Sequence, residues 1–393
     1  MKKALRKIHL WLSVPTGIII TLVCFSGAML VFEKEITEAI KPELYFVKEA
    51  KGEPIPMQQL MEKVEETLPD SVSISGVTVF ADSTRTYQVS LSKPRRASIY
   101  VNQYTGEVTG RSERLPFFNT MFHLHRWLLG SSSSVGKLLT GICTLVLVFI
   151  LITGILMWLT NRNKPLKASL AIHVTKGWGR FWHDLHVAGG IYATIFLLAM
   201  ALTGLTWSFS WYRTGFYACF GVESSEKGGA HGEGGNSHGE GRCSRGEGRY
   251  SHGDGRNNHE GKRGEGRGFH RRSPYRHWED VLNEVALKNP GYQQITLKPE
   301  VAEVVPEGRL SMRAADKYSY DRRSGEITDV QLYSAGKKDT KVRSGVYMVH
   351  TGSWGGIITR ILNFLAAFIG ATLPLTGYWL WFRRKRAAIA HHH

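Results

Sequence analysis

Four long apolar runs constrain the fold of this chain more than any other feature of its sequence. A helix that crosses a bilayer needs about 20 consecutive, mostly apolar residues. Only 42% of the 393 residues are hydrophobic, so the runs stand out against polar segments. The sequence therefore predicts an α-helical membrane protein with four transmembrane helices, at Leu10–Phe32, Val135–Leu159, Val187–Phe209 and Ile357–Phe382.

The first run also resembles a signal peptide, because Lys2, Lys3, Arg6 and Lys7 precede it. A secretory signal has an apolar stretch of only about 7–15 residues, followed by a cleavage site of small residues. Here the run is longer, and no such site follows before Glu33. We therefore expect a retained first helix.

Short basic segments beside the runs set the expected orientation, since Lys and Arg near the ends of spans stay in the cytoplasm. Besides the start of the chain, they are Arg162, Lys164, Lys167, Lys176 and Arg180 before the third run and Arg383, Arg384, Lys385 and Arg386 after the fourth. Both termini are expected to be cytoplasmic, in a bacterial inner membrane. The net charge of +17 is therefore explained by the orientation of the chain in a membrane. It does not indicate nucleic-acid binding, and no nucleic-acid-binding motif appears.

The two halves of the chain carry the same ordered series of motifs, which predicts a duplicated unit. In each half a His precedes a Ser-Gly or Thr-Gly pair, a second His precedes the next run, and a Thr-Gly pair closes that run. The members are His9, Gly27, His125 and Gly154 in the first half, and His186, Gly204, His350 and Gly377 in the second. The first glycine follows the first histidine by 18 residues in both halves (27 − 9 and 204 − 186).

Each half also holds a polar segment that is predicted to fold outside the membrane as a small α+β domain. Apolar spacing predicts helices at Met57–Leu68 and Trp278–Leu287, each ended by proline. Alternating patterns predict strands at Val77–Phe80, Thr86–Leu91, Ser98–Val101, Gln294–Leu297, Arg309–Arg313 and Lys317–Tyr320, and each domain closes with a strand, a turn and a strand. We expect one small antiparallel sheet with one helix in each domain.

The predicted order of the chain follows from these spans and domains. It is a cytoplasmic start and first span (1–32), a periplasmic domain (33–115), an interfacial segment and second span (116–160), a cytoplasmic loop (161–183), the third span (184–210), a second periplasmic domain (211–345), and the fourth span with a basic tail (346–393).

A Gly/His/Arg repeat of seven residues interrupts the second domain at 224–272. Its glycine content excludes a coiled coil and predicts disorder. The repeat is either an expanded linker or a collector of metal ions. The metal-binding alternative depends on His231, His238, His252, His259 and His270.

Four of the 16 histidines point to a redox cofactor. His9 and His186 are expected at the cytoplasmic ends of their spans, and His125 and His350 at the outer ends. One interfacial His is usually only a polar residue at the headgroup level, but four matched positions favour ligands. Because haem iron accepts neutral imidazole from two helices, we expect two haems, one near each face.

Two other histidines compete for these roles. His123 lies near His125, and His183 lies near His186. The repeat register favours His125 and His186, and the other two could shape the pocket or bind substrate. His173 and His277 are interpreted as ordinary surface residues, and no catalytic residue is predicted.

The cysteines exclude covalently attached haem. No C-x-x-C or C-x-x-C-H motif occurs, so the cofactor is expected to be haem b. Cys24 and Cys143 are expected to pack within spans, whereas Cys219 and Cys243 could form a disulfide outside. No motif for NAD(P)H or flavin is present, so the electron donor should be a separate molecule or protein.

The motifs together resemble the PepSY-associated transmembrane family, also called iron-regulated membrane proteins. The resemblance covers nearly all of the chain except the repeat loop. It rests on Arg6-Lys7-Ile8-His9-Leu10-Trp11, Leu124-His125-Arg126, Trp182-His183-Asp184-Leu185-His186, His350-Thr351-Gly352 and Thr376-Gly377-Tyr378-Trp379-Leu380-Trp381. It implies two PepSY-like periplasmic domains, and it assigns haem ligation to His9, His125, His186 and His350.

The resemblance also implies a function. Members of the family include ferric-siderophore reductases, so this chain is expected to pass electrons from the cytoplasmic side to a periplasmic ferric chelate. The alternative is a membrane-anchored PepSY module, an inhibitor of peptidases or a metal-uptake accessory, without redox activity.

Overall fold

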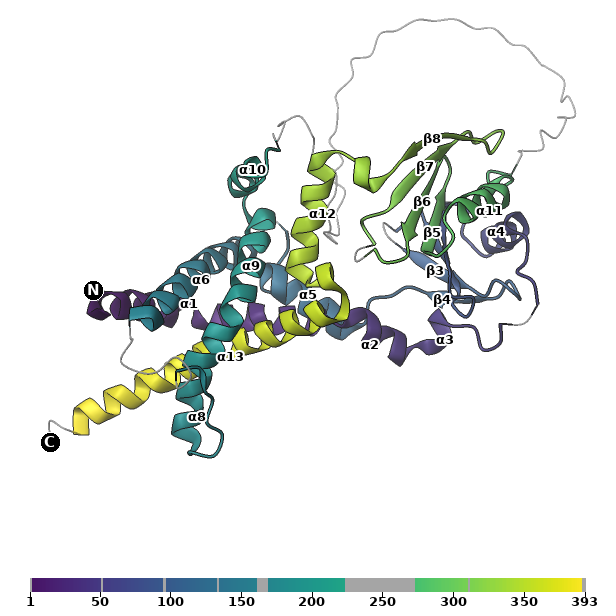
Figure 1. Ribbon diagram of the computed structural model, residues 1–393. Helices are drawn as coiled ribbons and strands as arrows, with labels where there is room; N and C mark the ends of the chain where they lie inside the picture. The colour runs from purple at the N-terminus through teal and green to yellow at the C-terminus, as the bar shows by residue number, and fades with distance from the viewer. Residues whose placement is uncertain are drawn as a thin grey trace, which may run out of the picture.

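The computed structural model describes residues 2–50, 52–94, 97–132, 134–160, 169–222, 273–309 and 312–390. They form a helical bundle and a β-sheet beyond one end of it (Figure 1). The end of the bundle next to the sheet is called the sheet side below, and the opposite end is called the far side. The repeat loop at 224–272, including Cys243, lies outside the described residues, as do the tail histidines.

The four predicted spans are helical. In the described part of the chain, four helices are long and apolar enough to cross a membrane. They contain α1 (Lys2–Leu30), α6 (Val135–Thr160), α9 (Gly190–Ser208) and α13 (Gly356–Ala390). The third span begins earlier than α9, because α8 (Trp178–Asp184) and a π-helical turn (Leu185–Gly189) lead into it. Apolar side chains such as Ile18 and Ile195 point outward, as contact with lipid requires.

Small buried residues let the four long helices approach one another. A Cβ added to Gly370 of α13 would lie 2.8 Å from Leu197 of α9. Close backbone approach of this kind is how helices associate in lipid, where burial of apolar surface gives little driving force. The core of the bundle contains Ile20, Cys24, Cys143, Leu151, Ala193, Leu197, Ala366 and Ala371.

Shorter helices connect the bundle to the sheet. α5 and α12 pack against α1 and α9, respectively. The connecting helices are α2 (Glu33–Ile40), α3 (Pro42–Tyr45), α5 (Pro116–Trp127), α10 (Ser210–Ala218) and α12 (Lys338–Thr351), with 3-10 turns at Tyr333–Ala335 and Ser353–Gly355.

The sheet corrects the prediction of two separate small sheets. One antiparallel sheet of eight strands runs in the order β4-β3-β2-β1-β5-β6-β7-β8. Its strands are β1 (Ile74–Phe80), β2 (Tyr87–Leu91), β3 (Ser98–Val101), β4 (Val108–Arg111), β5 (Tyr292–Lys298), β6 (Val301–Pro306), β7 (Asp316–Tyr320) and β8 (Ile327–Gln331). The predicted domains therefore supply four strands each to one continuous structure.

The junction between the two halves is the pairing of β1 with β5. Val77 pairs with Leu297, and Val79 pairs with Ile295. Separate sheets would leave β1 and β5 as edges with unpaired N–H and C=O groups, and such edges favour association. Joining them pairs both edges, and the paired residues Val77, Val79, Ile295 and Leu297 are buried.

Two helices cover one face of this sheet. α4 (Met57–Glu66) and α11 (Trp278–Lys288) lie side by side over it (Figure 1). Leu60, Val64, Trp278, Val281 and Leu297, all nearly or fully buried, belong to the same hydrophobic cluster. The single core therefore draws on both halves.

One predicted strand in the second half is wrong. The segment Arg309–Arg313 was predicted as a strand, but its described residues lie in the connection between β6 and β7. The strand instead occupies Val301–Pro306, where Ala302, Val304 and Val305 are buried. Gly308, with a φ of +76°, turns the chain after β6.

Candidate functional site

The predicted histidines meet in two pairs, and each pair takes one ring from each half. On the sheet side, His125 of α5 faces His350 of α12, with ring centroids 6.1 Å apart and planes at 55°. On the far side, His9 of α1 faces His186 of the π-helical turn, with centroids 6.5 Å apart and planes at 89°.

A hydrogen bond within its own half holds each sheet-side ring. The Nδ1 of His125 donates to the Val23 carbonyl at 2.8 Å. The Nδ1 of His350 donates to the Met200 carbonyl at 2.9 Å and lies 3.2 Å from the Thr203 hydroxyl. A carbonyl can only accept, so Nδ1 carries the hydrogen in both rings and Nε2 keeps its lone pair.

The far-side rings are held in the same way. His186 Nδ1 donates to the Leu373 carbonyl at 3.1 Å and lies 2.9 Å from the Thr376 hydroxyl. His9 Nδ1 lies 3.0 Å from the Thr153 hydroxyl, which itself donates to backbone carbonyls of α6. That hydroxyl therefore accepts from His9, and Nε2 again keeps its lone pair.

A glycine lies against each of the four rings, next to the Ser or Thr of the same motif. A Cβ would lie 2.8 Å from His125 at Gly27 and 3.1 Å from His350 at Gly204. The corresponding distances are 3.6 Å from His9 at Gly154 and 3.3 Å from His186 at Gly377. The Ser-Gly and Thr-Gly pairs identified in the sequence therefore lie in contact with the histidine rings.

The spacing within each pair fits two imidazoles on opposite sides of one metal ion. A nitrogen–metal bond of about 2.0–2.1 Å on each side separates two ring centroids by about 6–6.5 Å. In the described residues no group of three or more His, Cys, Asp or Glu could hold a metal ion. Haem iron takes only two ligands from the protein, because the macrocycle itself supplies four nitrogens, so each pair could hold a haem.

The competing histidines lie elsewhere. His123 packs its ring against Trp127, with centroids 5.0 Å apart, and is not paired with His350. The Nδ1 of His183 lies 3.2 Å from the Asp184 carboxylate. The structure thus places His125 and His186 in the pairs, as the repeat register predicts.

The sequence motifs gave no role to Asp184, a buried acidic residue near the far-side pair. The Asp184 carboxylate accepts from the Nε of Arg180 and lies within 2.8 Å of His173 Nδ1. His173 is therefore part of this polar cluster, which corrects its interpretation as an ordinary surface residue. The sequence does carry a signal for the role of Asp184, because an acidic residue stands at the start of an apolar span, four residues after Arg180. The π-helical turn that begins next to Asp184 carries His186.

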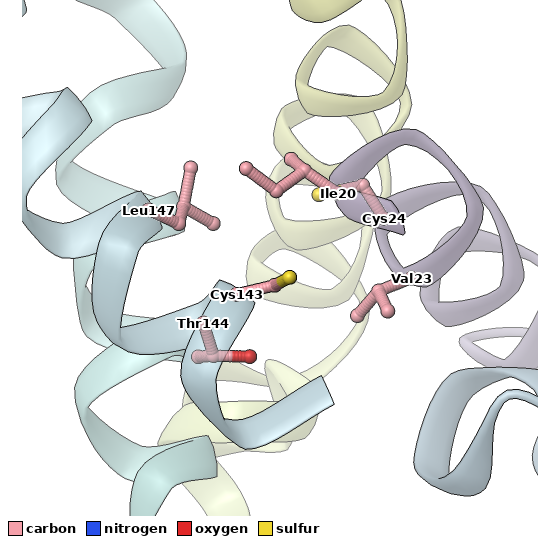
Figure 2. A pocket seen from close by; sticks show the side chains of 6 residues that line it. All are labelled: Ile20, Val23, Cys24, Cys143, Thr144 and Leu147. Carbon is pink, nitrogen blue, oxygen red and sulfur yellow. The ribbon is translucent and has the colours of Figure 1, made fainter. Parts of the chain in front are cut away.

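The two buried cysteines pack between helices, as predicted. Cys24 of α1 and Cys143 of α6 are free thiols beside a cavity of only about 10 Å³ (Figure 2). Ile20, Val23 and Leu147 supply its apolar walls. Cys219 is also free, and its predicted partner Cys243 lies outside the described residues.

These features define the class of protein. The chain is a multi-pass membrane protein with four apolar helices, paired histidines near both ends of the bundle, and an extramembrane antiparallel sheet. More specifically, it belongs to the family described as the PepSY-associated TM region, whose model matches residues 6–384. A comparison with curated proteins finds no significant match.

Proposed function

We propose that this protein transfers electrons across the bacterial inner membrane through two b-type haems and reduces a ferric chelate on the periplasmic side. The observation that carries the proposal is the pair of facing imidazoles at each end of the bundle, at ligand spacing and with Nδ1 anchored. A haem bound between each pair would supply reversible one-electron oxidation and reduction of its iron.

The residues around each pair have distinct roles in this proposal. His9 and His186 would hold the far-side haem, and His125 and His350 would hold the sheet-side haem. The hydrogen bonds from Nδ1 fix the tautomer, so that Nε2 is the nitrogen that would be free to bind the iron.

The proposed direction of transfer follows from the orientation of the chain. If both termini are cytoplasmic, as the basic segments predict, the far-side pair would lie on the side where electrons enter and the sheet-side pair on the side where they leave. Trp207 packs against His350, with ring centroids 5.0 Å apart. We expect this aromatic side chain to assist electron transfer at the sheet-side pair. The inner electron donor is a separate molecule or protein.

The test is the haem content of the purified full-length protein. We expect two haems per chain and a Soret band that shifts when dithionite is added. Reduced protein, freed of dithionite, should then reduce a ferric chelate in the absence of other donors.

The alternative function makes the opposite prediction. A membrane-anchored PepSY module that binds a peptidase or assists metal uptake needs no cofactor. Colourless protein with full helical content would therefore exclude the redox proposal and favour the binding module.

A further inference from the structure

The indole N–H of Trp158, near the far-side end of α6, is a buried donor without an acceptor. Its Nε1 atom is shielded from solvent, and no described residue accepts its hydrogen. Buried tryptophans usually find an acceptor for this group, because an unpartnered N–H costs about 1–3 kcal/mol. Within a bilayer there is no water to take the place of the missing partner. An acceptor bound near this end of the bundle would therefore remove the cost.

Trp158 belongs to the side of α6 that faces the far-side histidine pair. Leu151 is buried in the core of the bundle, and Gly154 lies against His9, with an added Cβ 3.6 Å from the ring. In a helix of 3.6 residues per turn, residue 158 shares a face with residues 151 and 154. Because helical side chains lean toward the N-terminal end of their helix, the indole is directed back toward Gly154.

The second half of the chain has an indole at the matching position. Trp158 follows Gly154 by four residues, and Trp381 follows Gly377 by four residues (158 − 154 and 381 − 377). Gly377 in turn lies against the ring of His186. The Nζ of Lys385 lies 4.3 Å from the centre of the Trp381 ring. An unpartnered N–H and a cation thus lie beyond the two glycines, and both favour a negatively charged acceptor.

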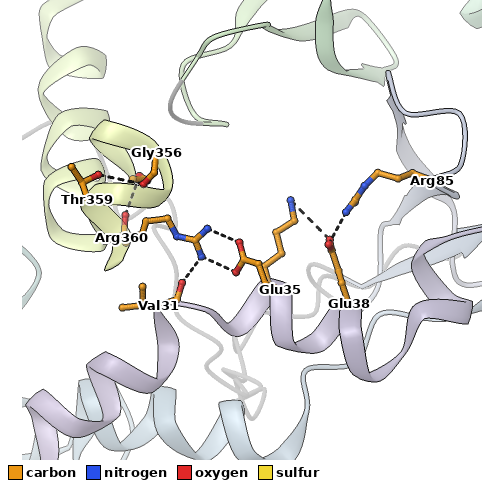
Figure 3. Close-up of polar contacts among 10 residues, drawn as sticks. Val31, Glu35, Glu38, Arg85, Gly356, Thr359 and Arg360 are labelled. Atoms are coloured by element: carbon orange, nitrogen blue, oxygen red, sulfur yellow. Dashed lines mark hydrogen bonds and ion pairs between the residues drawn. The ribbon is translucent and has the colours of Figure 1, made fainter. Parts of the chain in front are cut away.

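The protein itself has few carboxylates to offer at this end of the bundle. On the sheet side, Glu35 of α2 pairs with Arg360 of α13 (Figure 3). Asp184 is the single acidic residue in the described segments at the far side, which are 2–20, 150–160, 169–190 and 370–390. Its carboxylate already accepts from Arg180 at 2.8 Å. A negatively charged acceptor for the N–H would therefore come from a bound group.

We propose that the Trp158 N–H binds a carboxylate of the far-side haem. The inference rests on the proposed function. Haem b is apolar over most of its macrocycle and carries two carboxylate side chains at one edge. With this edge toward the far-side end of the bundle, a carboxylate would meet the Trp158 N–H and the positive charge of Lys385. Trp158 would then set how the macrocycle is rotated about the axis between His9 and His186.

The test uses full-length protein in which the far-side site alone holds haem. His125→Ala removes the sheet-side haem, and Trp158→Phe in that background removes the N–H but keeps an aromatic ring. The resonance Raman band for bending of the haem carboxylate side chains responds to hydrogen bonds on those groups. This band should shift in Trp158→Phe. It should stay unchanged in the control Trp11→Phe, which removes a far-side indole that is 77% exposed.

A second measurement follows the strength of haem binding. A hydrogen bond to a charged group contributes enough that its loss weakens binding about tenfold or more. Transfer of haem from the protein to excess apomyoglobin should therefore be about tenfold faster in Trp158→Phe. The reduction potential should also fall, because a less compensated carboxylate stabilises ferric over ferrous haem. Trp11→Phe should leave the transfer rate within about twofold of the parent and the potential unchanged.

The outcomes distinguish this inference from the function on which it rests. An unchanged Raman band and transfer rate in Trp158→Phe overturn the inference and leave the two haems of the proposed function in place. Protein without haem overturns both. If Trp158→Phe retains no haem, Trp158→Gln should restore binding, because its amide supplies an N–H donor again. Loss of haem from both variants would give residue 158 a packing role only and overturn the inference.

Discussion

The imidazole rings of His9 and His186 face each other across the two halves of the chain, with centroids 6.5 Å apart and planes at 89°. Each ring is anchored within its own half, through Thr153 and through the Leu373 carbonyl with Thr376. Any movement of one half against the other therefore changes the spacing of the pair. The same relationship holds between His125 and His350 on the sheet side.

Removing one ring from each pair should separate the two sites. We expect His9→Ala and His125→Ala each to lose about half of the haem, because each pair holds one cofactor. The measurement is haem per chain by pyridine haemochrome. His123→Ala is the matched control on α5 and should retain full haem. Loss of both haems from a single substitution, in protein that remains folded, would contradict two independent sites.

Adding one methyl group beside a ring should displace it. A Cβ at Gly27 would lie 2.8 Å from His125 Cε1, closer than atoms pack, so Gly27→Ala should lower sheet-side haem content. Gly345→Ala on α12 is the control, since nothing lies within 4 Å of its Cβ position. The control should change stability by about 1 kcal/mol or less, in the stabilising direction. Equal haem spectra of both variants would show that the space between residue 27 and the His125 ring accommodates a methyl group.

Shortening a buried side chain where β1 pairs with β5 should destabilise both halves of the sheet together. Leu297 is fully buried in the shared core, so Leu297→Ala should cost about 2–5 kcal/mol. Hydrogen exchange should then rise in β2 and β3 as well as in β6 and β7. Leu287, on α11 and 82% exposed, provides the control Leu287→Ala with little effect. Faster exchange confined to the second half would mean that the halves fold separately.

Acidification should remove the contribution of the Glu35–Arg360 pair. Hydrogen bonds from Arg360 hold the pKa of the Glu35 carboxyl below its ordinary value. The pair therefore stabilises the folded state above the unfolded-state pKa of about 4.3, and this contribution is lost as the pH falls through the lower folded-state pKa.

The thermal stability of Glu35→Gln tests this pH dependence. The variant should be less stable than the parent at pH 7, by about 1 kcal/mol or less because the pair is partly exposed, and should match it at acidic pH. Glu43→Gln, on the neighbouring α3, is the control for loss of one surface charge. A constant difference between Glu35→Gln and the parent at every pH would contradict the assignment.

The spans and the positions of the histidines could be predicted from the sequence, because both depend on local patterns. A run such as Val135–Leu159 must satisfy its backbone polar groups internally in lipid, so its helix requires no knowledge of distant residues. The pairing of His125 with His350 followed from the matched order of the motifs. The helices Met57–Glu66 and Trp278–Lys288 were likewise foreseen from their apolar spacing.

Only the tertiary structure decided how the two halves combine. The pairing of Val77 with Leu297 joins segments more than 200 residues apart, and the residue pattern of either strand does not identify its partner. A cavity where β1 ends and β5 begins is also lined by residues from segments more than 200 residues apart. Local periodicity specifies which face of an element is buried, but the partner that buries it is chosen by packing across the whole chain.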